Sequence, residues 1–162
     1  MGLFDFMKKK DNADVIAAPV AGEAVESAQI NDPTFGEEML GKGIAIKPAD
    51  TKIYAPFDGT VALVFDTKHA ISLVSETGAE VLIHVGLDTV SLKGEHFTTH
   101  VESGAAVKKG DLLMEFDKEA IAAAGFETII PVVVCNSDDY KDVKRITGSM
   151  VKPGDTIMEL EK

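Results

Sequence analysis

The fold of this chain is decided by two strand-like runs on either side of a turn signal: Ala70-Ile71-Ser72-Leu73-Val74, Ser75-Glu76-Thr77-Gly78 and Val81-Leu82-Ile83-His84. Aliphatic and β-branched residues in short runs are typical of strands. A glycine in the last place of a four-residue turn is what type I turns favour. The stretch therefore predicts a β-hairpin.

The register of this hairpin predicts which side chains meet. A hairpin centred between Glu76 and Thr77 pairs residues whose numbers sum to 153, which places His69 opposite His84. Opposed residues of an antiparallel pair carry Cβ atoms about 4.5–5.5 Å apart on the same face. Two neighbouring imidazoles suit phosphoryl transfer or metal binding. A satisfied structural pair is the alternative, and a slip of one residue would turn the two rings to opposite faces.

Short runs rich in Val and Ile recur along the rest of the chain, separated by Gly, Pro or Asp every 8 to 12 residues or so. This spacing predicts an all-β protein, an antiparallel sandwich or barrel with few short helices. One helix is expected after Asp117, an N-cap residue, because an Ala-rich run follows and ends at Gly125. Single helical turns are expected at residues 35–41 and 139–144.

Two pairs of segments repeat within the chain. Residues 18–25 are similar to residues 55–62, and both open with Ala-Pro. Residues 107–115 are similar to residues 151–159, and both contain Val-Lys-x-Gly-Asp. That sequence predicts a turn in which Gly takes a positive φ and Asp accepts a hydrogen bond from nearby backbone. The repeats predict a duplicated β unit.

Composition restricts the class of protein. A chain of 162 residues that is 45% hydrophobic and 27% charged is expected to form one globular domain. A formal net charge of −11 argues against nucleic acid as the main partner and favours a basic protein partner. Cys135 is the only cysteine, which excludes an internal disulfide and suits a cytoplasmic location. We expect its thiol to be buried.

The first residues differ from the rest. Leu3, Phe4 and Phe6 precede three lysines, which favours either a weak contact with an anionic membrane surface or a frayed tail. We therefore expect a flexible N-terminal segment over residues 1–14 and a domain over residues 15–162. No apolar run in the sequence approaches the roughly 18 residues of a membrane span.

Several blocks together resemble one known family, the glucose-type enzyme IIA of the bacterial phosphoenolpyruvate:sugar phosphotransferase system. The blocks are Leu82-Ile83-His84-Val85-Gly86-Leu87-Asp88-Thr89-Val90, Leu92-Lys93-Gly94-Glu95, Gly43-Ile44-Ala45-Ile46-Lys47-Pro48, Tyr54-Ala55-Pro56-Phe57-Asp58-Gly59, Thr67-Lys68-His69-Ala70 and Pro131-Val132-Val133-Val134. The resemblance runs from about Ile16 to the C-terminus. It implies an antiparallel β-sandwich with a duplicated hybrid motif.

The resemblance also implies a phosphotransferase that works through a phosphohistidine. His84 would accept the phosphoryl group on Nε2, and His69 would hydrogen-bond the phosphoryl oxygens. Thr67 would orient His69, and the carbonyl of Gly86 would hold the Nδ1–H of His84. Asp88 and Asp32 would flank the site.

An apolar rim of Phe35, Phe65 and Val90 is expected to dock the partner proteins. The resemblance implies phosphorylated HPr as the donor and a cysteine of a IIB domain of a sugar permease as the acceptor, with no cofactor required. Two positions depart from the family pattern, and this puts partner specificity in question. Lys68 stands where the family often has Asn, and Ser91 where many members have an acidic residue.

Three other functions compete with the phosphoryl carrier. A lysostaphin-type zinc peptidase shares the duplicated architecture, but its catalytic zinc needs three protein ligands; zinc at His69 and His84 would need a third ligand from elsewhere. A biotinyl or lipoyl carrier needs a lysine at the tip of a tight turn, typically beside Met, and no Met-Lys-Met or Asp-Lys-Ala tip is present in the right place. A regulatory binding module is compatible with phosphotransfer. His96 and His100 are expected at the surface.

Overall fold

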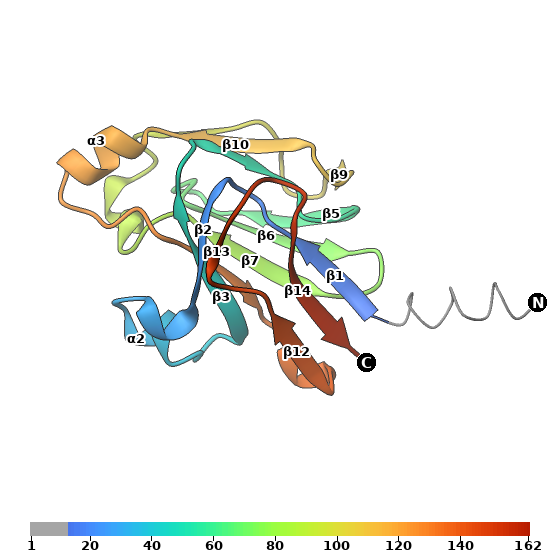
Figure 1. Ribbon diagram of the computed structural model, residues 1–162. Coiled ribbons are helices and arrows are strands. Elements are labelled where there is room, and N and C mark those ends of the chain that lie inside the picture. Colours follow the sequence, from blue (N-terminus) through green and yellow to red (C-terminus); the bar gives the residue numbers. More distant parts are fainter. Residues whose placement is uncertain (1–12) are drawn as a thin grey trace, which may run out of the picture.

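The structure is a computed structural model that describes residues 13–162 (Figure 1). Most of the predicted N-terminal segment, with its proposed membrane contact, lies outside the described residues. Strand β1 begins at Ala13, two residues before the predicted start of the domain, and Ala13 pairs with Glu161 of the last strand. None of the helices within residues 13–162 is both long and apolar enough to cross a membrane.

Strands dominate the described chain, and its helices are short. The elements in order are β1 (Ala13–Ala17), β2 (Gly22–Glu26), η1 (Ser27–Gln29), α2 (Pro33–Gly36), β3 (Lys42–Pro48), β4 (Lys52–Tyr54), β5 (Gly59–Val64), β6 (Ala70–Ser75), β7 (Glu80–His84), η2 (Thr89–Leu92), β8 (Phe97–Thr99), β9 (Ala106–Val107), β10 (Leu112–Phe116), α3 (Lys118–Ala123), β11 (Ile130–Val134), η3 (Ser137–Asp139), β12 (Asp142–Arg145), β13 (Ser149–Val151) and β14 (Thr156–Glu161). Within residues 13–162, helices α2 and α3 lie at the periphery of the strands (Figure 1).

The strands of residues 13–162 form one large sheet and two small ones. The large sheet has the order β13-β2-β3-β11-β7-β6-β5-β9, and the small sheets have the orders β1-β14-β12 and β4-β10-β8. The paired strands run antiparallel. The predicted antiparallel β-sandwich is therefore confirmed.

The large sheet buries side chains on both of its faces. Ile83 and Val132 belong to the main core between the sheets, whereas Leu82 and Val133 belong to a second, smaller apolar cluster. Because successive residues of a strand point to opposite faces, the second cluster lies on the outer face of the sheet. It also contains Phe35 of α2.

The predicted duplication is visible in the backbone. The amide of Ala17 donates to the carbonyl of Pro56, and the amide of Tyr54 donates to the carbonyl of Pro19. Tyr54 lies 37 residues after Ala17, and Pro56 lies 37 residues after Pro19. The two hydrogen bonds are therefore equivalent, and the two Ala-Pro segments contact each other reciprocally. The two repeats thus meet about a local pseudo-twofold axis.

The two Val-Lys-x-Gly-Asp segments form equivalent turns. Asp111 accepts a hydrogen bond from the amide of Lys108 (2.8 Å), and Asp155 accepts one from the amide of Lys152 (3.0 Å). The glycine between them has a φ of 94° in the first turn and 97° in the second, where a left-handed backbone favours glycine. The predicted turn chemistry is confirmed.

Predictions for the helical segments had mixed outcomes. Helix α3 begins after Asp117, which accepts from the amide of Ala120, and it ends in a Schellman motif at Gly125, as expected. A helical turn is present near residue 35, because α2 covers Pro33–Gly36. The turn expected at 139–144 lies earlier in the chain, as η3 (Ser137–Asp139), and the rest of that prediction was wrong, since residues 142–145 form β12, which pairs with β14 and buries Val143.

The prediction of a buried thiol at Cys135 was also wrong, because this residue is exposed. Strand β11 ends at Val134, so Cys135 begins the connection that follows and leaves the buried layer. Neighbouring atoms still shield the thiol partly from water, and this partial desolvation and the nearby Glu80 carboxylate raise its pKa, which keeps it in the protonated, weakly nucleophilic form.

Candidate functional site

His84 occupies the last position of β7, on the outer face of the large sheet. It is two residues from Leu82, so both side chains point toward the second apolar cluster. The ring of His84 is half-buried, and the ring of Phe35 packs on it with centroids 4.9 Å apart. The sheet thus gives His84 a rigid, apolar base and leaves part of its ring accessible.

The hairpin register that was predicted for this region is wrong by one residue. His84 pairs with Ala70, and Ile83 pairs with Ile71. The amides of Gly78 and Ala79 both donate to Ser75, and Gly78 has a φ of 104°, so an extra residue is accommodated in the loop. The ladder residue opposite His84 is therefore not His69.

The two imidazoles nevertheless meet, because His69 lies outside the ladder. It ends the loop between β5 and β6, where the amide of Phe65 donates to the carbonyl of Ala70 and Lys68 has a φ of 60°. Strand alternation does not govern a loop residue, and the ring of His69 is free to turn toward His84. The ring centroids lie 4.8 Å apart at 82°, which is an edge-to-face arrangement. The neighbouring pair was predicted, although for the wrong reason.

A backbone carbonyl fixes the proton on His84. Its Nδ1 lies 2.7 Å from the carbonyl oxygen of Gly86, and a carbonyl only accepts, so Nδ1 carries the hydrogen. In the neutral ring Nε2 therefore has a free lone pair. Gly86 has a φ of 81°, and its amide donates to the carbonyl of Ile129. This left-handed turn directs its carbonyl back to the ring.

His69 is held by a side chain instead. Its Nδ1 lies 2.6 Å from the hydroxyl of Thr67, and the ring of Phe65 contacts it edge-on with centroids 5.6 Å apart. His69 is 4% exposed. Its ring is thus fixed by a hydrogen bond, an aromatic contact and its neighbour His84.

Both rings resist protonation. Burial, and then the proximity of His84, lower the pKa of His69 from 6.5 to about 4. Burial also lowers the pKa of His84, whereas the Gly86 carbonyl, Asp32 and Asp88 act in the opposite direction. At neutral pH the site therefore presents two uncharged imidazoles.

The two predicted carboxylates lie on different elements and both favour a positive charge on His84. Asp32 is the N-cap of α2, where its carboxylate accepts from the amide of Thr34 (2.9 Å). Asp88 precedes η2 with a φ of 60°, and its side chain is exposed. Asp32 therefore caps helix α2 and also contributes negative charge near His84.

The three predicted rim residues differ in exposure. Phe35 is 7% exposed because it packs on His84, whereas Val90 is 51% exposed. Phe65 is half-buried against the second cluster. Phe35 and Phe65 therefore wall the imidazoles, and Val90 offers apolar surface to the solvent.

The sequence analysis missed Thr89. This residue is fully buried, and its hydroxyl donates to the carbonyl of Val85 (2.6 Å). Its methyl group lies beneath Gly86, because a Cβ added there would come within 2.6 Å of it. Thr89 therefore supports the turn that aims the Gly86 carbonyl. A polar residue directly after Leu-Asp was the only signal for it.

The remaining histidines stay apart from the pair. His96 and His100 are exposed, as expected, and His100 contacts Glu115 at 2.8 Å. Across residues 13–162, no group of three or more His, Cys, Asp or Glu side chains is placed to hold a metal ion. Because a catalytic zinc takes three protein ligands, the described residues do not fit a zinc peptidase.

Comparison with known proteins is consistent with this geometry. Residues 14–140 match the family model described as phosphoenolpyruvate-dependent sugar phosphotransferase system, EIIA 1. The glucose-specific EIIA component of Oceanobacillus iheyensis is 42% identical over 153 residues, which cover 94% of this chain and 93% of that protein. The solved glucose permease IIA from Mycoplasma capricolum aligns with a TM-score of 0.81 and 33% identity, over 91% of this chain and 95% of that one.

The chain is also similar to one part of larger proteins. The beta-glucoside-specific EIIBCA component of Dickeya chrysanthemi is 48% identical over 147 residues, which cover 91% of this chain and 23% of that protein. The chain therefore spans about a quarter of the length of that relative. With a family model that matches most of the chain and a relative of the same length, the chain belongs to the EIIA 1 family of the phosphoenolpyruvate-dependent sugar phosphotransferase system and is a phosphoryl carrier of the glucose type.

Proposed function

We propose that this carrier takes its phosphoryl group from phosphorylated HPr on Nε2 of His84 and passes it to a cysteine of a IIB domain. In the first step Nε2 forms a bond to phosphorus while the donor's P–N bond breaks, and that bond's electron pair returns to the donor imidazole. In the second step the cysteine sulfur forms a bond to phosphorus, and the electron pair of the N–P bond returns to His84.

One observation carries the proposal, namely the 2.7 Å hydrogen bond between Nδ1 of His84 and the Gly86 carbonyl. It leaves the lone pair on Nε2, the nitrogen that the half-buried ring can present to a partner. Phosphoryl transfer asks a protein mainly for positioning and charge stabilisation, so a fixed tautomer is most of what the acceptor must supply.

His69 has the place of a phosphoryl-binding residue in this proposal. Its ring lies 4.8 Å from that of His84, and its Nδ1 contacts the Thr67 hydroxyl. When Thr67 donates to Nδ1, the hydrogen of His69 lies on Nε2 and can be donated to a phosphoryl oxygen. Because the pKa of His69 is about 4, it would do so as a neutral donor that binds the dianion without trapping it.

Asp32 and Asp88 would keep the bound group transferable. Their carboxylates place negative charge beside His84, and a phosphoryl dianion there is repelled. The exposed carboxylate of Asp88 is also available to pair with a cationic partner surface.

The partner assignments rest on chemistry and on relatives. Relatives such as the EIIBCA component carry an EIIA region in one chain with other components, which supports a IIB domain as the acceptor. A net charge of −11 suits a basic donor surface, and HPr is proposed as that donor. Val90, together with Phe35 and Phe65, would supply the apolar part of the docking face.

A cytoplasmic location and a reaction without a cofactor complete the proposal. Zinc at His69 and His84 is a subordinate proposal, because the described residues supply these two ligands and the third must come from another molecule.

The experiment is intact-mass spectrometry after incubation with phosphoenolpyruvate, enzyme I and HPr. Wild type and His69→Ala are expected to gain one acid-labile phosphoryl group, and His84→Ala none, with the exposed His100→Ala as the matched control. His69→Ala is expected to pass its phosphoryl group on more slowly. Phosphorylation of His84→Ala, or none of wild type, would contradict the proposal.

A further inference from the structure

The segment that carries Phe35 is short and lies outside the sheets. Helix α2 has four residues, and most of the backbone hydrogen bonds of residues 32–41 stay within the segment, such as Met39 to Thr34 and Gly41 to Glu38. A single helical turn has no stability of its own in water. The position of Phe35 against His84 must therefore depend on contacts that tie this segment to the rest of the protein.

Glu38 provides such a tie, and its own backbone is strained to do so. Its φ is 57°, in the left-handed region that non-glycine residues seldom occupy. Its carboxylate oxygen Oε2 accepts one hydrogen bond from the amide of Gly43 (3.1 Å) and another from the guanidinium of Arg145 (2.5 Å). A strained residue persists where surrounding contacts hold it, and these two contacts converge on one oxygen.

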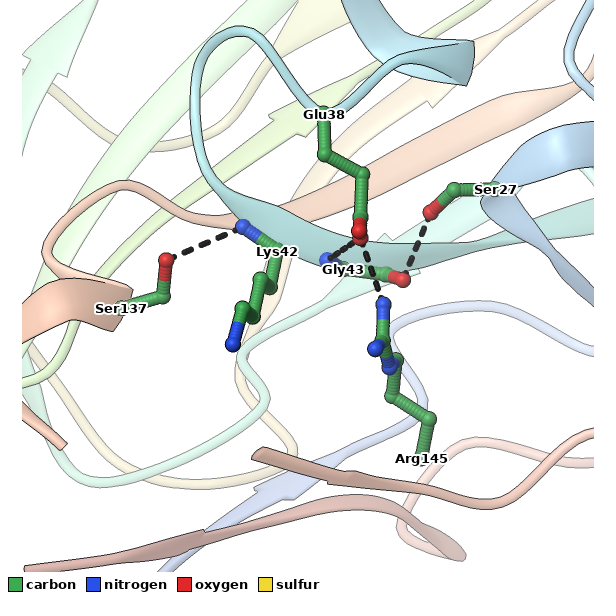
Figure 2. A network of polar contacts seen from close by, with 6 residues as sticks. All are labelled: Ser27, Glu38, Lys42, Gly43, Ser137 and Arg145. Carbon is green, nitrogen blue, oxygen red and sulfur yellow. Dashed lines mark hydrogen bonds and ion pairs between the residues drawn. The ribbon is translucent and has the colours of Figure 1, made fainter. Parts of the chain in front are cut away.

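Figure 2 shows how these contacts join different parts of the fold. Gly43 belongs to β3 of the large sheet, and its carbonyl also accepts from the hydroxyl of Ser27 (2.6 Å). Arg145 ends β12, in the small sheet β1-β14-β12. The Glu38 carboxylate therefore links the α2 segment both to the sheet that carries His84 and to the sheet packed across from it.

Arg145 is the only arginine in the chain. Its side chain and that of Glu38 are 35% and 27% exposed, so the pair is partly shielded from solvent. Lysine is far more frequent in this chain, but arginine presents a planar group with several donors to a carboxylate. Arg145 lies 107 residues from Glu38 along the chain, and its guanidinium donates to the α2 segment through the Glu38 carboxylate.

The structure assigns to Arg145 and Glu38 the role of a positioning pair that holds the α2 segment so that Phe35 stays packed on His84. This inference rests on the proposed role of His84 as the phosphoryl acceptor. Neither residue touches the reacting atoms; they act through Phe35, whose ring centroid lies 4.9 Å from that of His84. Loosening the pair would let Phe35 move, which changes both the wall of the acceptor and the surface the donor meets.

The test compares Arg145→Ala, Arg145→Lys and Glu38→Gln with Lys144→Ala, the neighbouring exposed residue on β12, as matched control. The first readout is the nuclear Overhauser contact between the Phe35 and His84 rings in the unphosphorylated protein. We expect Arg145→Ala and Glu38→Gln to weaken it, Arg145→Lys to restore it in part, and Lys144→Ala to preserve it.

The second readout is the steady-state rate of phosphoryl transfer from the phosphorylated donor. We expect Arg145→Ala to raise the KM about two- to fivefold, the size typical of a partly exposed ion pair, with a smaller change in kcat. The double variant Arg145→Ala/Glu38→Gln is expected to equal the single ones, because both remove the same interaction.

Additive effects of the two substitutions, or an Arg145→Ala protein that is less stable but keeps the ring contact and the KM, would overturn the inference. If Arg145→Ala does not fold, Glu38→Gln carries the test by itself, because its amide oxygen still accepts from Gly43. The ring contact needs no phosphorylation, so failure of the proposed function, seen as an unphosphorylated wild type, is distinguishable from failure of this inference.

Discussion

The Nδ1 atom of His84 lies 2.7 Å from the carbonyl oxygen of Gly86, two residues further along the chain. A strand end and a left-handed turn are enough to make this contact, and it determines which imidazole nitrogen has a lone pair. The chemistry of this carrier therefore depends on the backbone of residues 84–86 as much as on the histidine itself.

The substitution Gly86→Ala tests that dependence. A Cβ at position 86 would meet Thr89 Cγ2 at 2.6 Å and the Glu127 carbonyl oxygen at 2.8 Å, with φ at 81°. We expect a loss of about 1–3 kcal/mol of unfolding free energy in urea, as strain of this kind typically costs, and phosphorylation slowed about tenfold or more. Gly104→Ala is the control, since φ there is 91° but open space surrounds the new Cβ. Equal effects at both positions would contradict the account.

Thr67→Val tests the hydrogen bond to His69. Valine keeps the shape of threonine and removes the hydroxyl that lies 2.6 Å from Nδ1. We expect onward transfer to slow about tenfold, the equivalent of one lost hydrogen bond, and His69 to show a mixture of tautomers in ¹⁵N spectra. The exposed Thr60→Val on β5 is the matched control. Transfer at the wild-type rate would show that His69 is oriented by packing alone.

Stability is expected to depend on pH through His69. Its folded pKa of about 4 lies below the unfolded value of about 6.5, so between these values the unfolded chain binds the extra proton. The unfolding free energy therefore rises with pH across this window, with a slope near 1 kcal/mol per pH unit around pH 5 from this residue. His69→Gln should flatten the slope in denaturant titrations. His96→Asn, at an exposed site, should leave it unchanged, and an unchanged slope in His69→Gln would refute the assignment.

The carboxylates are expected to set the pKa of His84. Asp88→Asn and Asp32→Asn each remove a negative charge that favours protonated His84. The pKa of His84, followed by NMR titration, should fall further in both variants, because each loses a charge that stabilises the protonated ring. Asparagine remains a good N-cap, so Asp32→Asn should keep α2 in place. A rise of the His84 pKa in either variant would mean that the carboxylate affects His84 by holding the surrounding structure in place and not by its negative charge.

Substitutions at Lys68 test whether the backbone conformation of this loop positions His69. The φ of Lys68 is 60° and its side chain is exposed. Asparagine tolerates this backbone region whereas a β-branched residue does not, so Lys68→Asn should retain stability and transfer. Lys68→Val should lose about 1–2 kcal/mol and slow the transfer. The reverse order of the two variants in urea unfolding would contradict the proposed backbone role.

Local chemistry explains which features the sequence predicted well. The Val-Lys-x-Gly-Asp turns and the α3 caps each depend on residues within a few positions of one another, and both were confirmed. The family blocks predicted His69, His84, Thr67 and Gly86 at one site. In the structure Thr67 is hydrogen-bonded to His69, Gly86 is hydrogen-bonded to His84, and the two rings contact each other.

The failures have a common origin in backbone geometry and long-range pairing. The hairpin register slipped because Gly78 takes a left-handed conformation that lengthens the loop, which the turn signal did not specify. Residues 142–145 form a strand only because β14 is beside them. The contact of Glu38 with Arg145 spans 107 positions, and no local pattern indicates it.

The most direct test of the central claim is the ¹⁵N spectrum of the phosphorylated protein, in which the two imidazole nitrogens of each histidine are distinguished by their couplings to the ring protons and to phosphorus. The account predicts a phosphoryl group bonded to Nε2 of His84, with Nδ1 still protonated and hydrogen-bonded to Gly86. A phosphoryl group on Nδ1 of His84, or on His69, would contradict it.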